Sequence, residues 1–196
     1  MAMPALVPAH GVSGRRWTAR EVRRLIAENP LASPRYELVD GELLVTPSPN
    51  YPHQRAVYLL IVALHSYLER NPVGRVLTSP FDVELEPETV TQPDLFVIPP
   101  HEARRLLTEM PARELILAAE VLSPSSGRHD RVTKKPLYQR HVDEYWIIDL
   151  DARLFERWRP SDERPEIITK LLEWLPAGAA DAFSLDLARY FVEVFD

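Results

Sequence analysis

Two apolar stretches constrain the fold of this chain most strongly, because each carries a single carboxylate. Residues 92–98 read Gln-Pro-Asp-Leu-Phe-Val-Ile, and residues 115–122 read Leu-Ile-Leu-Ala-Ala-Glu-Val-Leu. Short apolar runs of this kind predict buried strands. A charged side chain on a strand that is apolar on both faces is costly unless something neutralises it. Asp94 and Glu120 therefore require partners of opposite charge.

Two interpretations of this carboxylate pair follow from the sequence. A divalent cation held between the strands would neutralise both side chains, because hard cations take oxygen ligands from Asp and Glu. Adjacent strands lie ~4.8 Å apart, so carboxylates on the same face reach one ion, together with the carbonyl of Val121. In the other interpretation, each carboxylate is paired separately with an Arg or Lys. The pattern alone leaves both open.

Composition limits the classes of protein and of metal. The 196 residues fit one domain, and the hydrophobic content of 45% and charged content of 27% are typical of a soluble globular protein. The chain has no cysteine, so disulfides and thiolate metal sites are excluded, which favours Mg, Mn or Ca over structural Zn. The net charge of −6 argues against non-specific coating of nucleic acid. The start resembles neither a signal peptide nor a membrane span, so we expect a cytoplasmic protein.

Local patterns in the first half predict a flexible arm over residues 1–14, followed by a single α/β domain over residues 15–196. A capping box formed by Thr18 and Glu21 predicts a helix over residues 19–28. An Asp-Gly turn within residues 36–45 predicts a hairpin. Pro52 suits the first turn of a long amphipathic helix over residues 53–70. A strand is expected within residues 75–85, where apolar residues alternate at Phe81, Val83 and Leu85.

Patterns in the second half continue the alternation of helices and strands. Residues 101–110 predict a short surface helix, and residues 128–140 a basic helical segment capped by Asp130. Pro136 must kink that segment or lie in its first turn. Strands are expected over residues 145–150 and 154–159, and one more within residues 167–174. Ser184 is expected to cap a last helix, with Leu185 on its buried side.

Several polar residues are candidates to join the two carboxylates. Lys134 is placed to stabilise developing negative charge, and Tyr138 lies one helical turn further on the same face. Glu37 is a candidate third carboxylate or an exposed strand residue, and His53 either approaches the site or lies at the surface. Ser123 has no base placed to activate it, which disfavours serine hydrolysis. In the alternative interpretation the basic residues form only a solvated face: Arg128, Arg131, Lys134, Lys135 and Arg140.

Six short motifs are spread over most of the chain, from about Thr18 to Phe191. They are Tyr36-Glu37-Leu38-Val39-Asp40-Gly41-Glu42, His53-Gln54-Arg55, Gln92-Pro93-Asp94, Glu120-Val121-Leu122-Ser123-Pro124-Ser125, Asp130-Arg131 with Lys134 and Tyr138, and Glu144-Tyr145-Trp146. Each motif is weak alone, but the six in this order resemble the motifs of a known family. That family is the bacterial putative restriction endonuclease family within the PD-(D/E)XK nuclease superfamily.

This resemblance implies a fold and an activity. The fold is a restriction-endonuclease-like core, with a mixed central β-sheet flanked by helices. The activity is Mg-dependent hydrolysis of DNA phosphodiester bonds, with Mn as a substitute metal and Asp94 and Glu120 as metal ligands. The superfamily's lysine normally stands two residues after the Glu, where this chain has Leu122. Lys134 matches the position from which this family supplies the lysine. Lys135 is the alternative site lysine, because Pro136 interrupts the segment.

Three hypotheses about function remain open on the sequence. The first is a metal-dependent DNA endonuclease, for which a homodimer is natural because cutting both strands is simplest with two symmetric sites. The second is a non-catalytic module of the same fold that binds nucleic acid or protein. The third, a two-carboxylate glycosidase, is weaker because both acids lie in strands too apolar to bind a sugar. No membrane partner is expected.

Overall fold

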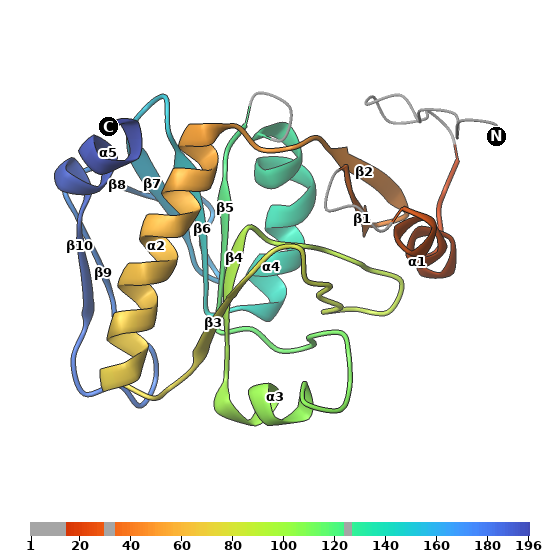
Figure 1. The fold of residues 1–196 in the computed structure, drawn as a ribbon, viewed down its shortest axis with the longest axis horizontal. Coiled ribbons are helices and arrows are strands. Elements are labelled where there is room, and N and C mark those ends of the chain that lie inside the picture. The colour runs from red at the N-terminus through yellow and green to blue at the C-terminus, as the bar shows by residue number, and fades with distance from the viewer. Residues whose placement is uncertain (1–14, 30–33, 124–126) are drawn as a thin grey trace.

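The computed structural model describes residues 15–29, 34–123 and 127–196. The expected arm over residues 1–14 lies outside the described residues. Figure 1 shows the helices and strands along the chain. Their bounds are α1 Ala19–Glu28, β1 Arg35–Val39, β2 Glu42–Thr46, α2 Tyr51–Arg70, β3 Arg75–Thr78, β4 Leu95–Ile98, α3 Pro100–Arg105, β5 Leu117–Val121, the π-helix η1 His129–Lys134, α4 Lys135–His141, β6 Glu144–Asp149, β7 Leu154–Trp158, β8 Glu166–Ile168, β9 Leu171–Trp174, β10 Phe183–Asp186 and α5 Leu187–Phe195.

The centre of the molecule is a mixed sheet in the order β3-β4-β5-β6-β7-β8. Only the β5–β6 pair is parallel, and the other neighbours run antiparallel. A parallel pair needs a crossover connection, which η1 and α4 supply on one face of the sheet. Helix α2 covers the opposite face (Figure 1). The α/β class and the mixed central sheet flanked by helices are therefore as the sequence predicted.

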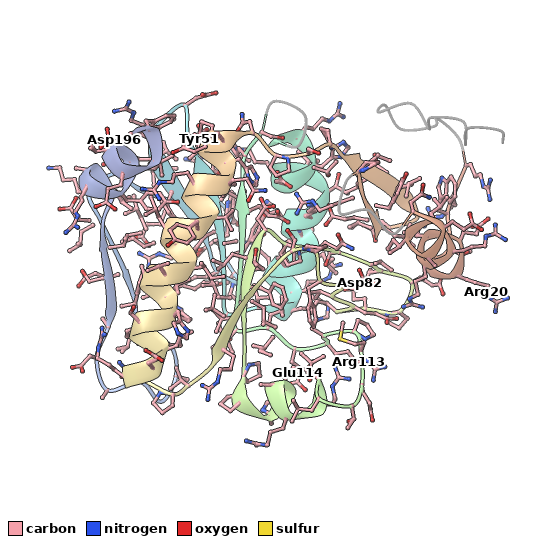
Figure 2. All side chains as sticks on the ribbon, in the orientation of Figure 1. Arg20, Tyr51, Asp82, Arg113, Glu114 and Asp196 are labelled. Atoms are coloured by element: carbon pink, nitrogen blue, oxygen red, sulfur yellow. The ribbon has the colours of Figure 1, made fainter. Side chains whose placement is uncertain are left out.

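The central strands are apolar on both faces because each face packs against its own layer. Leu95 and Val97 of β4 join the core beneath α2 and α5, which also contains the fully buried Trp146. Phe96 and Ile98 point to the other face and join the core beneath α4. Burial of each such side chain stabilises the fold by about 1.5–3 kcal/mol. Side chains fill both layers (Figure 2).

Several local predictions are confirmed. Thr18 and Glu21 form the capping box at the start of α1. The β1–β2 hairpin turns at Asp40 and Gly41, which have φ of 50° and 76°, as an Asp-Gly turn requires. Helix α2 begins after Asn50, whose side chain caps it, and Pro52 lies in its first turn.

Within residues 15–29, 34–123 and 127–196, no helix combines the length and the apolar character that a membrane span requires.

Four local predictions need correction. The strand expected within residues 75–85 is present as β3, but it ends at Thr78 and does not include the alternating residues Phe81, Val83 and Leu85. Pro80 has no N–H to continue a ladder, and Val83 makes only isolated bridges. The expected surface helix ends at Arg105 rather than residue 110. Residues 166–174 form two strands, β8 and β9, instead of one. Ser184 and Leu185 belong to β10, which pairs with β9, so Asp186 caps α5 instead.

Candidate functional site

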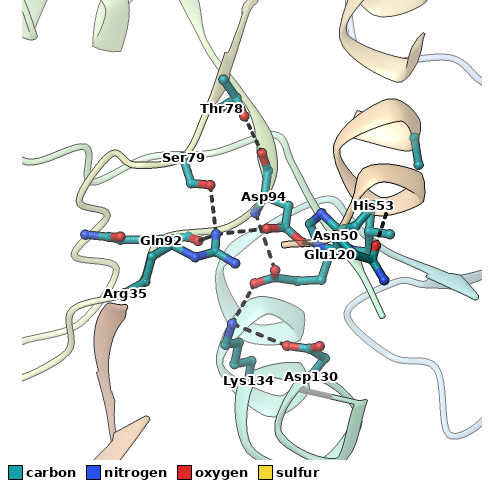
Figure 3. Close-up of polar contacts among 12 residues, drawn as sticks. Arg35, Asn50, His53, Thr78, Ser79, Gln92, Asp94, Glu120, Asp130 and Lys134 are labelled. Atoms are coloured by element: carbon teal, nitrogen blue, oxygen red, sulfur yellow. Dashed lines mark hydrogen bonds and ion pairs between the residues drawn. The ribbon is translucent and has the colours of Figure 1, made fainter. Parts of the chain in front are cut away.

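The two carboxylates from the apolar stretches lie side by side. The antiparallel register of β4 and β5 pairs Leu95 with Ala119, which brings Asp94, one residue before β4, next to Glu120. The Asp94 backbone N–H lies 3.4 Å from Glu120 Oε2, and the Val121 N–H donates to Asp94 Oδ2 at 3.0 Å. Both side chains are buried. Figure 3 shows the two carboxylates facing one another.

Lys134 reaches this pair from the crossover segment. Its ammonium Nζ lies 2.8 Å from Glu37 Oε2, 3.0 Å from Glu120 Oε1 and 3.3 Å from Asp130 Oδ1. Asp130 therefore does not cap the helix as expected, since it lies inside η1 and its carboxylate faces Lys134. Three carboxylates from three parts of the chain thus surround one buried ammonium.

Pro136 explains why the segment that carries Lys134 is a π-helix. Pro136 lies in the first turn of α4, which follows η1 directly, and it has no N–H to donate to a carbonyl of the preceding turn. Extending an α-helix back through it would bring its ring against the carbonyl of Val132. The chain instead forms the wider π-turn of η1 just before it, a feature that is frequent at functional sites. Lys134 consequently points inward, whereas Lys135 is not brought to the cluster and lies 4.3 Å from the centre of the Trp158 ring.

The remaining sequence candidates also lie in the cluster. The Tyr138 hydroxyl donates to Glu120 Oε1 at 3.4 Å. Glu37, fully buried in β1, accepts from the Gln92 N–H at 2.8 Å through its second oxygen. His53 begins α2, and its Nε2 lies 3.0 Å from Asp94 Oδ2.

Sequence reasoning missed two members of the cluster, namely Asp130, which was expected to cap a helix, and Arg35. Its Nη1 donates to Asp94 Oδ1 at 2.8 Å and to Ser79 Oγ at 2.7 Å. The two residues of this ion pair lie 59 positions apart in the sequence. One signal was available, because Arg35 and Glu37 are two residues apart on one strand and therefore share a face.

The charges of this cluster do not balance. Its carboxylates are Glu37, Asp94, Glu120 and Asp130, and its permanent cations are Lys134 and Arg35. Even with a protonated His53 beside Asp94, the carboxylates exceed the cations by one. Asp94 and Glu120 each have a basic neighbour, as the second interpretation expected, but among the described residues the carboxylates of the cluster outnumber its cations.

The pKa values of Asp94 and Glu120 are shifted in opposite directions. Burial raises the pKa of Asp94, but the His53 contact and the Arg35 charge outweigh it and hold that pKa well below its ordinary value. Burial raises the pKa of Glu120 well above its ordinary value; the Lys134 charge opposes this rise, and the charges of Asp94, Asp130 and Glu37 add to it. Burial lowers the pKa of Lys134, but its three carboxylates raise it well above the ordinary value. Lys134 therefore stays charged.

A cavity of about 270 Å³ opens beside the cluster, and we call it the acidic cavity. Among its lining residues are Asn50, His53, Asp94, Glu120, Ser123, Asp130, Lys134 and Arg35. A larger hollow of about 640 Å³ lies elsewhere, between the end of α2, β3 and α3, and its lining is mostly apolar. We place the candidate site at the acidic cavity because the ionisable groups converge there.

The donors at the acidic cavity fit a hard divalent cation. A carboxylate has about four acceptor positions. Asp94 uses three, for Arg35, His53 and the Val121 N–H, and Glu120 uses three, for Lys134, Tyr138 and the Asp94 N–H. Each carboxylate thus keeps one oxygen position for a further partner, and the unbalanced charge is negative. No three His, Asp or Glu side chains within the described parts of the chain form a ready-made cation cage, so carbonyl or water oxygens would complete the shell.

Comparisons with known proteins give a family from the sequence and a similar fold from a solved structure. The family model described as "Putative restriction endonuclease" (Uma2) matches residues 21–188. Among solved structures, the chain is similar to a putative nuclease belonging to DUF820 from Anabaena variabilis, with a TM-score of 0.69 and 20% sequence identity. The similarity covers 86% of this chain and 96% of that one, and at this identity it shows the fold. A search of curated proteins found no match.

Proposed function

The chain belongs to the Uma2 family of putative restriction endonucleases, and from this premise we propose that it is a metal-dependent endonuclease that hydrolyses DNA phosphodiester bonds. One observation carries the proposal. Asp94 and Glu120, from adjacent strands, share a buried, net-negative cluster with Lys134 at the wall of an open cavity. Acids on neighbouring strands beside a lysine suit metal-assisted attack on a phosphate.

In this proposal Asp94, Glu120 and the Val121 carbonyl hold Mg²⁺, or Mn²⁺ in its place. The bound ion supplies a Lewis acid for a phosphate oxygen and lowers the pKa of a coordinated water. Lys134 stabilises the negative charge that develops on the phosphate oxygens. Its ammonium lies at the cavity wall and stays protonated.

The other residues position these groups. Glu37 and Asp130 hold the Lys134 ammonium in place, and the Tyr138 hydroxyl donates a hydrogen bond to Glu120. His53 orients Asp94 through its Nε2. Lys135 has no role, because its side chain stacks on Trp158. Cleavage of both strands of a duplex would need two copies of the site, and we therefore propose that the active form is a homodimer.

Plasmid cleavage tests this function. Supercoiled DNA is incubated with the protein and Mg²⁺ or Mn²⁺, beside the Asp94→Asn and Glu120→Gln variants. Glu109→Gln is the matched control, because it makes the same chemical change at an exposed side chain. We expect each site variant to lose activity by about 100-fold or more and the control to cleave normally. Undiminished cleavage by both site variants would refute the assignment.

A non-catalytic module that binds nucleic acid or protein is the second candidate function. It is favoured by the pairing already present, since Asp94 and Glu120 each contact a basic side chain. This alternative predicts that the folded chain takes up no Mn²⁺ and that EDTA does not change its binding to DNA. Metal-dependent cleavage would exclude it.

A further inference from the structure

A second cavity lies against the acidic cavity and differs from it in charge. It has a volume of about 250 Å³, and we call it the arginine cavity. The two cavities share Arg35, His53 and Asp94 as lining residues. The rest of the arginine cavity is neutral and is lined by Pro47, Ser48, Pro49, Gln54, Val57, Thr78, Ser79 and Pro80.

The difference in charge gives the two cavities different ligand preferences. Three carboxylates line the acidic cavity, namely Asp94, Glu120 and Asp130. Within the described parts of the chain, Asp94 is the one carboxylate that lines the arginine cavity, and there it is paired with Arg35 at 2.8 Å. Without a metal, the acidic cavity would repel an anion. The same anion meets much less repulsion in the adjoining arginine cavity.

Arg35 keeps unused hydrogen-bonding capacity at this shared wall. Its side chain is 10% exposed, and its contacts with Ser79, Gln92 and Asp94 all leave from Nη1 (Figure 3). Among the described residues nothing accepts a hydrogen bond from Nε, and Nη2 donates to none of them. Nε is buried, whereas Nη2 is accessible to solvent. A buried guanidinium with spare donors suits a phosphate, because its planar fork matches phosphate oxygens.

Neutral hydrogen-bond donors line the arginine cavity near Arg35. Ser79 Oγ accepts from Arg35, so its own hydroxyl hydrogen is free to donate to a ligand. The amide of Gln54 lines the cavity from the exposed side of α2. Hydroxyl and amide donors beside an arginine are the groups that proteins use to hold the DNA backbone without reading its sequence.

We infer that the arginine cavity binds the DNA backbone phosphate next to the scissile one, with Arg35 as its positioning residue. This inference rests on the proposed function, because it takes the scissile phosphate to lie in the acidic cavity. A strand held at both points would be fixed in register with Asp94 and Glu120. Arg35 would then serve two purposes, neutralising Asp94 through Nη1 and holding the strand through its remaining donors.

DNA binding in EDTA tests the inference without requiring cleavage. The affinity for a fluorescent duplex is measured by anisotropy at several salt concentrations. Arg35→Gln should weaken binding about tenfold and reduce the slope of log K against log salt by about 0.9, the value for one lost phosphate contact. Gln54→Glu, at an exposed position that leaves the Arg35–Asp94 pair intact, should weaken binding by repelling the phosphate.

The control for Gln54→Glu is Leu107→Glu, which adds the same charge at a side chain that is 84% exposed beyond α3. It should bind within about twofold of the wild type. If Arg35→Gln fails to fold, as circular dichroism would show, Gln54→Glu with this control decides the question. The inference is overturned if wild-type protein binds no DNA, or if the variants that fold bind with the wild-type affinity and salt slope.

The two proposals fail in distinguishable ways. Binding that depends on Arg35 or Gln54, in a protein that cleaves no DNA with any metal, would support the phosphate site and refute the nuclease. Metal-dependent cleavage with an unchanged salt slope in the variants would support the nuclease and refute the phosphate site.

Discussion

Two buried glutamates in this molecule have opposite electrostatic surroundings. Glu102 in α3 is 1% exposed and Glu120 in β5 is 2% exposed. Glu102 accepts from Arg105 at 2.6 and 2.8 Å and from the Arg113 N–H at 2.6 Å. The Arg105 hydrogen bonds hold the pKa of Glu102 below its ordinary value. Burial raises the pKa of Glu120 well above that same value.

This difference is the basis on which we propose that Glu102 is a structural acid and Glu120 a functional one. Glu102 is paired with Arg105, three residues along the chain, and accepts from the Arg113 N–H. Its charge is therefore balanced by residues close to it in the sequence. Glu120 shares Lys134 with Glu37 and Asp130 beside an open cavity. We therefore use burial with too few cations, rather than burial alone, as the criterion for a candidate functional carboxylate.

Removing the cation from each region should give the largest effect. Lys134→Met leaves three buried carboxylates without their shared ammonium, so we expect it to destabilise the fold by about 3–5 kcal/mol. Arg105→Met should cost about 1–3 kcal/mol, because Arg105 is partly exposed and Glu102 keeps the Arg113 N–H. Urea denaturation measures both. An equal or smaller cost for Lys134→Met would contradict the proposed difference.

Neutralising the acids themselves should give changes of opposite sign. Glu102→Gln loses charge-assisted hydrogen bonds and should destabilise the fold by about 1–3 kcal/mol at pH 7. Glu120→Gln removes one of the excess negative charges, so we expect the metal-free protein to become more stable. The same urea series gives both values. Destabilisation by both substitutions would show that Glu120 is as well satisfied as Glu102.

The pH dependence of stability should separate the two glutamates further. The pKa of Glu102 is lowered in the fold, so its contribution is present above the ordinary value of 4.5 and is lost as the pH falls through the folded pKa. The pKa of Glu120 is raised, so wild-type protein loses stability relative to Glu120→Gln as the pH rises above 4.5. Denaturation of wild type and both Gln variants from about pH 2 to pH 8 tests these slopes. Parallel curves would contradict them.

Removing the Tyr138 hydroxyl should give the smallest effect. Its contact with Glu120 is long, at 3.4 Å, and the ring keeps its packing against Tyr145 at 4.7 Å between centroids. We expect Tyr138→Phe to cost about 0.5–1.5 kcal/mol. Thermal unfolding of the metal-free variant measures it. A cost comparable to that of Lys134→Met would mean that the hydroxyl, rather than the lysine, organises Glu120.

Much of the fold was predictable from local patterns. Periodicity located α2, the β1–β2 hairpin and the apolar strands, because each pattern is complete within a few residues. The juxtaposition of Asp94 and Glu120 followed from single acids in apolar runs that had to pair in one sheet. Ser184 was misassigned because a serine before an apolar run is typical of a cap, and the pairing of β10 with β9 overrides that local preference.

The remaining parts of the site depend on geometry that no local pattern carries. The inward orientation of Lys134 rather than Lys135 depends on a π-turn in η1, and a shift from α to π register changes which neighbour faces the sheet. Asp130 was predicted to cap this helix, but it lies inside η1 and its carboxylate faces Lys134. Arg35 reaches Asp94 only because the hairpin packs beside the end of β4, a contact that follows from tertiary structure alone.

Titration calorimetry with Mn²⁺ tests the central claim most directly, namely that the excess carboxylates beside Glu120 bind a divalent cation. We predict uptake of about one ion per chain by the wild type and by Glu102→Gln, and none by Glu120→Gln or Asp94→Asn. Equal uptake by wild type and Glu120→Gln, or no uptake by folded wild-type protein, would contradict the claim.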